Sequence, residues 1–133
     1  MDQATLVVEQ IDEGAKITEE LRSQNIDVVA AFWMKASEDG HWYFYIASPI
    51  VDQLGFAKAY RKVHGALRNL LPNIWVDLFQ IKLIAEHNPI ACDVINVQNR
   101  YPGQLPIRFE GSHLGNVTID QAYIYPGASA SKS

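Results

Sequence analysis

The chain has 133 residues, of which 48% are hydrophobic and 20% are charged, which is ordinary for a globular protein. This length predicts one domain that buries a core without a metal or a disulfide. The net charge of -4 disfavours general nucleic-acid binding, and the single cysteine, Cys92, excludes an intrachain disulfide.

The sequence also carries signals about location. The first residues are acidic and show no basic-then-apolar leader pattern. No apolar run approaches the roughly 20 residues that are needed to cross a bilayer. A lone cysteine fits a reducing compartment, and the apolar neighbours of Cys92 predict a buried structural thiol. We therefore expect a cytoplasmic protein with no membrane contact.

The first predicted elements are a helix over residues 3–23 and a β-hairpin over residues 28–49. Apolar residues recur at helical spacing in the first segment, and most large aromatic residues fall in the second. A three-residue loop, 38–40, with Gly40 in the left-handed conformation, would close the hairpin. It would give three cross-strand pairs: Phe32 with Ile46, Met34 with Phe44, and Ala36 with Trp42.

This hairpin register separates two faces. One face is wholly apolar and is predicted to be core; it holds Phe32, Met34, Trp42, Phe44 and Ile46. The other face is large but polar-tipped; it holds Trp33, Lys35, Tyr43 and Tyr45. This second face either packs under a helix or meets another chain.

The rest of the chain predicts two helices, a strand and a second hairpin. Residues 53–71 read as a helix that ends at Pro72, and residues 75–85 alternate as a strand. In that strand Trp75, Phe79, Ile81 and Leu83 would share one face. Asn88-Pro89 is a helix start signal, and that helix runs to about Arg100. The last hairpin spans Ile107 to Tyr125, with a turn at Gly115-Asn116.

The predicted fold class is α+β, in the order α-β-β-α-β-α-β-β. Residues 1–125 would form a single domain with a mainly antiparallel sheet covered by helices. Residues 126–133 are small and polar and predict a disordered C-terminal tail. The connection from 41–48 to 76–84 is either a parallel crossover or an antiparallel return, and the sequence leaves both open.

Several fragments together resemble a known family. They are AFW at 31–33, IASPIVD at 46–52 with Gly55, AYRKV at 59–63, and GNVTIDQAYIYP at 115–126. The combination is similar to a family of small uncharacterised bacterial proteins, over most of the chain from the first helix to Tyr125. No activity, cofactor or catalytic residue is implied by this resemblance.

The most uneven charge distribution lies in the helix over 53–71. No acid falls between residues 53 and 76, and the basic residues cluster opposite the apolar stripe. The candidate anion-binding set is Lys58, Arg61, Lys62 and Arg68. This set predicts either a site for an anion or an acidic partner, or a solvated face that offsets acids elsewhere.

Catalytic chemistry has weaker signals. Asp77, Gln80 and Lys82 have the residue types of a metal-dependent nuclease strand, but a regular strand points Asp77 and Lys82 to opposite faces. The four histidines show no metal-ligand spacing; they are His41, His64, His87 and His113. We therefore predict no catalytic residue, no metal and no cofactor.

The favoured functional hypothesis is a non-catalytic protein-interaction module or small accessory subunit. Its predicted interaction surface is the aromatic hairpin, with Trp33, Tyr43 and Tyr45 as binding residues, and its partner is a second copy or another protein. The alternative is a nucleic-acid-processing enzyme, or an anion- or nucleic-acid-binding protein that uses the basic helix. Nucleic acid is the less favoured partner because the chain is acidic overall.

Overall fold

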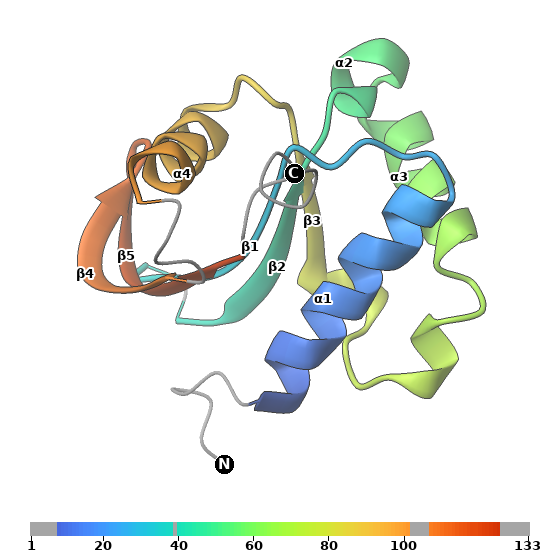
Figure 1. The fold of residues 1–133 in the computed structure, drawn as a ribbon, viewed down its shortest axis with the longest axis horizontal. Helices are drawn as coiled ribbons and strands as arrows, with labels where there is room; N and C mark the ends of the chain where they lie inside the picture. The colour runs from blue at the N-terminus through green and yellow to red at the C-terminus, as the bar shows by residue number, and fades with distance from the viewer. Residues whose placement is uncertain (1–7, 39, 102–106, 126–133) are drawn as a thin grey trace.

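The computed structural model describes residues 8–38, 40–101 and 107–125 (Figure 1). The predicted C-terminal tail, 126–133, lies outside the described residues, as does Asp39 of the first turn. The helices are α1 (Val8–Ser23), α2 (Ile50–Leu54), α3 (Phe56–Ala66) and α4 (Pro89–Arg100). The strands are β1 (Ala30–Ala36), β2 (Trp42–Ala47), β3 (Ile81–Ile84), β4 (Ile107–Leu114) and β5 (Val117–Ile124). Two 3₁₀ turns, η1 (Leu71–Asn73) and η2 (Leu78–Gln80), precede β3.

The five strands form one sheet in the order β3-β2-β1-β5-β4. Among the described residues, three strand pairs are antiparallel and the pair of β2 with β3 is parallel. The α+β class with a mainly antiparallel sheet is therefore confirmed. The open question about the connection after β2 is also settled, because α2 and α3 carry the chain across to a parallel strand.

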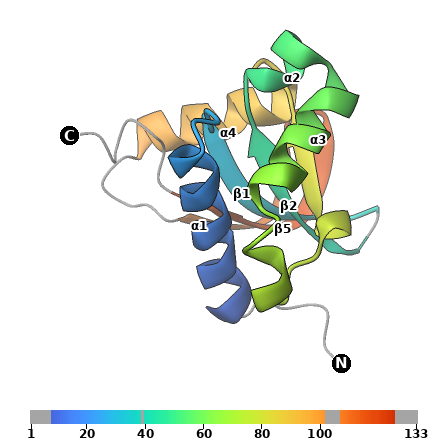
Figure 2. The same cartoon turned by 90° about the vertical axis from the view of Figure 1, so that its right-hand side faces the viewer.

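Helices cover both faces of the sheet. Helix α4 lies on one face, and α1, α2 and α3 lie on the other (Figures 1 and 2). Two clusters of buried residues result, one built around Trp33 and Phe44 and the other around Phe32 and Met34. The central strands are thus buried on both sides, as their almost unbroken apolar sequence requires. No helix in the described part of the chain is long and apolar enough to cross a bilayer.

The predicted hairpin register is wrong by one residue. Phe32 pairs with Tyr45, and Trp33 pairs with Phe44. A shift of one residue exchanges the faces of one strand relative to the other. The predicted apolar face is consequently divided, because Phe32 and Met34 pack toward α4 whereas Phe44 packs toward α1.

The register prediction is wrong because both faces of the first hairpin are buried. The separation of apolar from polar-tipped residues onto different faces therefore does not select the register. The rings of Phe32 and Tyr45 stack with centroids 5.2 Å apart. Gly40 adopts the predicted positive φ, +75°, and its N–H donates to the carbonyl of Ala36. The last ladder pair is Lys35 with Trp42, so the loop is longer than the predicted three residues.

Other sequence predictions differ in detail. The single helix over 53–71 is divided at Gly55, whose φ is +83°, and helical geometry ends at Ala66. The strand over 75–85 is shortened to Ile81–Ile84. Cys92 is exposed rather than buried, because its position on α4 points away from the sheet while Ala91 and Val94 face it. The start of α4 is as predicted, with the side chain of Asn88 accepting from the N–H of Ile90.

Helix α1 packs closely against the sheet at Gly14. A Cβ atom at this position would overlap the hydroxyl of Tyr125 and lie 2.9 Å from Nε1 of Trp33. The Trp33 Nε1–H donates to that hydroxyl, which in turn donates to the carbonyl of Ile11. The close approach therefore lets one tyrosine connect the sheet to the backbone of α1. Burial is the main cause that raises the pKa of Tyr125 well above its ordinary value.

We expect Gly14→Ala to lower the free energy of unfolding by about 1–3 kcal/mol, because the added methyl group overpacks this contact. Alanine is the better helix former, so helix propensity alone predicts the opposite sign. Denaturant titration of the purified variant measures the change.

Gly65→Ala in α3 is the matched control. Nothing lies within 4 Å of a Cβ atom added there. This substitution is expected to raise the free energy of unfolding by about 0.5–1 kcal/mol through helix propensity. Stabilisation by both substitutions would contradict the close approach at Gly14.

Candidate functional site

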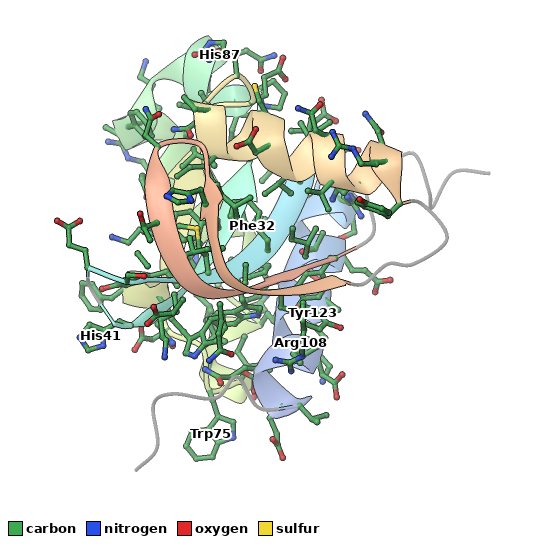
Figure 3. The ribbon with its side chains drawn as sticks, turned by 90° about the vertical axis from the view of Figure 1, so that its left-hand side faces the viewer. Phe32, His41, Trp75, His87, Arg108 and Tyr123 are labelled. Carbon is green, nitrogen blue, oxygen red and sulfur yellow. The ribbon has the colours of Figure 1, made fainter. Side chains whose placement is uncertain are left out.

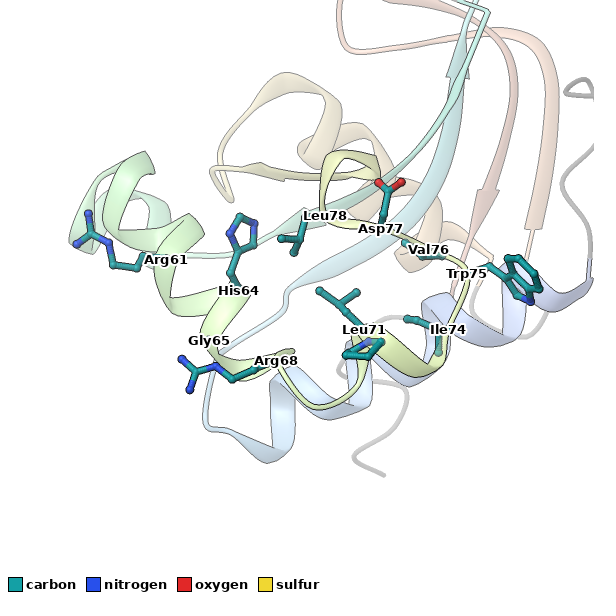
Figure 4. A pocket seen from close by; sticks show the side chains of 11 residues that line it. Arg61, His64, Gly65, Arg68, Leu71, Ile74, Trp75, Val76, Asp77 and Leu78 are labelled. Atoms are coloured by element: carbon teal, nitrogen blue, oxygen red, sulfur yellow. The ribbon is translucent and has the colours of Figure 1, made fainter.

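An open, largely apolar cavity lies between α3 and the segment that leads into β3 (Figure 4). Its volume is about 600 Å³. Its lining residues are Arg61, His64, Gly65, Arg68, Leu71, Pro72, Ile74, Trp75, Val76, Asp77 and Leu78. We call this cavity the α3 groove. Its volume is within the range of cavities that bind ligands or anchoring side chains.

The wall opposite α3 consists of irregular backbone that side chains hold in place. The carboxylate of Asp77 accepts hydrogen bonds from the N–H groups of Phe79, at 2.9 Å, and Gln80, at 3.2 Å. The side chain of Gln80 accepts from the N–H of Asp77 in return, at 3.2 Å. This reciprocal capping box starts η2 and replaces the predicted strand at this point.

A buried acid fixes the same segment from the other side. The side chain of Glu13 on α1 accepts hydrogen bonds from the N–H groups of Trp75, at 2.9 Å, and Val76, at 3.0 Å. Glu13 is only 7% exposed, and a carboxylate at such a position needs these donors. The groove wall is thus fixed to α1 through its backbone, so its side chains are free to face outward.

Two large aromatic side chains of the segment before β3 are almost fully exposed, and of these only Trp75 lines the α3 groove. Trp75 is 84% exposed and Phe79 is 89% exposed, and Leu78 between them is 38% exposed. Figure 3 shows Trp75 projecting from the molecule on the side of the sheet away from α4. The prediction that Trp75 and Phe79 share one strand face with Ile81 and Leu83 is therefore wrong, because Trp75 and Phe79 lie outside β3. A fixed backbone that presents an exposed indole is typical of an interaction surface rather than of a core.

The residues of the predicted anion-binding set are all exposed. Lys58, Arg61 and Lys62 lie on α3, whose buried residues are Ala59 and Val63, and Arg68 follows the end of that helix. None of the four cations forms an ion pair with another residue in the described ranges. Arg61 and Arg68 line the α3 groove, whereas Lys58 and Lys62 do not. The cations nearest the groove are therefore the two arginines.

His64 contributes a polar group to the same wall. Its Nε2 atom is buried and has no hydrogen-bond partner among the described residues. Its ring lies 5.8 Å from the ring of Tyr60, measured between centroids, and the hydroxyl of Tyr60 accepts from the N–H of Leu83 at 2.9 Å. The hydroxyl group of Tyr60 is thus hydrogen-bonded to β3.

The three hairpin residues predicted as an interaction surface are divided between the two faces of the sheet. Trp33 is fully buried between the sheet and α1, on the face opposite Tyr43 and Tyr45. Tyr45 stacks on Phe32, and Nζ of Lys82 lies 4.5 Å from the ring centroid of Tyr43. Of the two alternatives left open for this face, Trp33 follows the one that packs under a helix. The cause is the one-residue register shift, combined with coverage of both faces of the sheet.

The three residues considered for a nuclease site make different structural contacts. Asp77 and Gln80 cap η2, and Lys82 packs over Tyr43. Across the residues that the structure describes, no group of three or more histidine, cysteine, aspartate or glutamate side chains could hold a metal ion. Nε2 of His87 lies 2.8 Å from a carboxylate oxygen of Asp52, and both side chains are exposed.

Comparison of the chain with models of protein families, with curated proteins and with solved structures finds no match. The resemblance to small bacterial proteins therefore stays a prediction, and the case for function comes from the residues of the site.

Glu13 provides a test of how the groove wall is held. We expect Glu13→Ala to lower the free energy of unfolding by about 2–3 kcal/mol, because the buried N–H group of Val76 and the partly buried N–H group of Trp75 lose their acceptor. The amide protons of Trp75 and Val76 should also exchange faster with solvent, which NMR measures residue by residue.

Glu19→Ala, at an exposed position on the same helix, is the control and should change the free energy of unfolding by less than about 0.5 kcal/mol. Unchanged amide exchange at Trp75 and Val76 in Glu13→Ala would show that the carboxylate does not hold this wall.

Proposed function

We propose that the protein is a non-catalytic protein-interaction module and that its binding surface is the α3 groove together with Trp75. The observation that carries this proposal is an indole that is 84% exposed on a backbone anchored by the buried Glu13. Tryptophan is among the residues that contribute most to protein–protein binding energy. Trp75 lines the same cavity as the apolar residues Leu71, Ile74 and Leu78. A contiguous apolar surface of this kind marks a site of interaction.

The groove supports binding better than bond-making chemistry. Its single carboxylate, Asp77, is already engaged by two backbone N–H groups, and its imidazole, His64, has a buried Nε2. General acid–base catalysis needs a group within hydrogen-bond reach of the reacting proton. The remaining walls are aliphatic and aromatic side chains and exposed guanidinium groups, which suit recognition.

Nucleic-acid binding is the second candidate, because an exposed aromatic residue beside cations can stack on a base. Trp75 and the two groove arginines provide this combination. The aliphatic wall of Leu71, Ile74 and Leu78 favours a protein side chain over a base, and the chain carries a net charge of -4.

Site-specific photocrosslinking tests the proposal. Gly65 lines the groove and has open space at its Cβ position, so we place a photo-reactive benzoylphenylalanine there. The matched control position is the exposed Asn99 on α4. We expect crosslinks from position 65 to one identified protein, which then binds the purified module. Crosslinks only to RNA, or equal crosslinking from both positions, would contradict the proposal.

The substitution Trp75→Ala tests whether this side chain contributes to partner affinity without contributing to stability. The free energy of unfolding should change by less than about 0.5 kcal/mol, because the side chain is exposed, whereas partner affinity should fall by at least about 30-fold, as for an interface hot spot. Calorimetry measures the affinity and denaturant titration the stability. Tyr101→Ala, at an exposed aromatic residue at the end of α4, is the control and should leave affinity unchanged.

The predicted homodimer is tested separately by light scattering at about 100 μM, a concentration well above the dissociation constant of a stable dimer. A dimer that dissociates in Trp75→Ala would identify the partner as a second copy. A monomeric mass would leave a different protein as the partner.

A further inference from the structure

We propose that the partner segment in the α3 groove is an acidic peptide that carries one large apolar anchor residue. This inference rests on the proposed interaction function and specifies its ligand. Three features support it: the local charge, the apolar wall, and the position of the single acid in the groove.

The local charge is opposite to that of the whole protein. Residues 53–76 contain four Lys or Arg residues and no acid, whereas the chain has a net charge of -4. These cations are exposed and have no acidic partner in the described residues, so an incoming carboxylate does not need to break an existing ion pair. Complementary charge guides encounter and fixes orientation.

The type of cation also matters. Arg61 and Arg68, rather than the two lysines, line the groove. Arginine binds carboxylates through two parallel N–H···O hydrogen bonds, and its guanidinium group is less strongly hydrated than an ammonium group. The two arginines are therefore suited to aspartate or glutamate side chains of a peptide.

The apolar wall provides the place for an anchor. Leu71, Ile74 and Leu78 line the cavity of about 600 Å³, and Trp75 stands at its end (Figure 4). A leucine or aromatic side chain that enters the groove removes these surfaces from water. Interfaces commonly combine a buried anchor with a charged rim in this way.

The single acid in the groove predicts which side of the groove the acidic residues of the peptide occupy. Asp77 lies on the wall opposite the two arginines (Figure 4). Its negative charge would repel an acidic residue there, so the peptide acids belong on the α3 side and neutral residues beside η2. Asp77→Asn removes the repulsion and keeps the cap, since asparagine is also a favoured N-cap residue.

Selection of phage-displayed 12-residue peptides on the purified protein tests the inference. We expect enriched sequences to combine two or more acids with a leucine or aromatic residue. Synthetic, fluorescein-labelled copies should lose at least tenfold in affinity for Arg61→Glu with Arg68→Glu, and gain about twofold to fivefold for Asp77→Asn. The charge-matched control, Lys16→Glu with Arg100→Glu at exposed positions on α1 and α4, should leave affinity within twofold.

A peptide in which lysine replaces the acids should show the reverse preference and bind the Arg61→Glu, Arg68→Glu protein better than the wild type. Circular dichroism confirms that each variant is folded, and Arg61→Gln with Arg68→Gln provides a milder variant. Enriched peptides that lack acids, but still depend on Trp75, would overturn this inference and leave the proposed function in place.

Tighter binding of a labelled 12-nucleotide oligouridine than of any peptide, with the same dependence on Trp75 and both arginines, would overturn the inference in favour of nucleic acid. If no peptide is enriched and position 65 yields no crosslink, both the inference and the proposed function are wrong.

Discussion

Two neighbouring residues of α1, Glu13 and Gly14, connect this helix to the candidate site and to the sheet. Gly14 lets the helix approach the sheet closely enough for the Tyr125 hydroxyl to meet both Trp33 and the backbone of Ile11. One residue earlier, Glu13 binds the backbone of the groove wall. The position of α1 on the sheet therefore also sets the position of Trp75. A displacement of this helix would alter the core and the groove together.

Much of the fold could be predicted because local signals agree with the global arrangement. The Asn88-Pro89 start of α4, the two hairpins and the order of elements follow from capping, turn residues and periodicity. The register of the first hairpin could not be predicted in this way, because β1 is buried on both sides. With Trp33 under α1 and Phe32 under α4, either register buries apolar residues, and only the covering helices decide between them.

The exposed position of the basic residues could be predicted, because Lys58, Arg61 and Lys62 fall opposite the apolar stripe of a helical segment that contains no acid. The exposed Trp75 was missed because alternation of apolar residues predicted a strand. The available signal was the spacing of Asp77 and Gln80, which is typical of a capping box and starts a turn there. The buried role of Glu13 depends on a contact 62 residues away, which no local pattern contains.

The groove wall has a physical consequence for recognition. Its backbone belongs to no long helix or strand, yet its N–H groups donate hydrogen bonds to the side chains of Glu13, Asp77 and Gln80. A wall that is ordered before binding loses little conformational entropy when a partner arrives, so more of the contact energy of Trp75 appears as affinity. The same hydrogen bonds explain how a short segment exposes two aromatic rings without collapsing onto the core. Fixed backbone and exposed side chains are thus two results of one arrangement, in which α1 supplies the anchor and α3 supplies the charge.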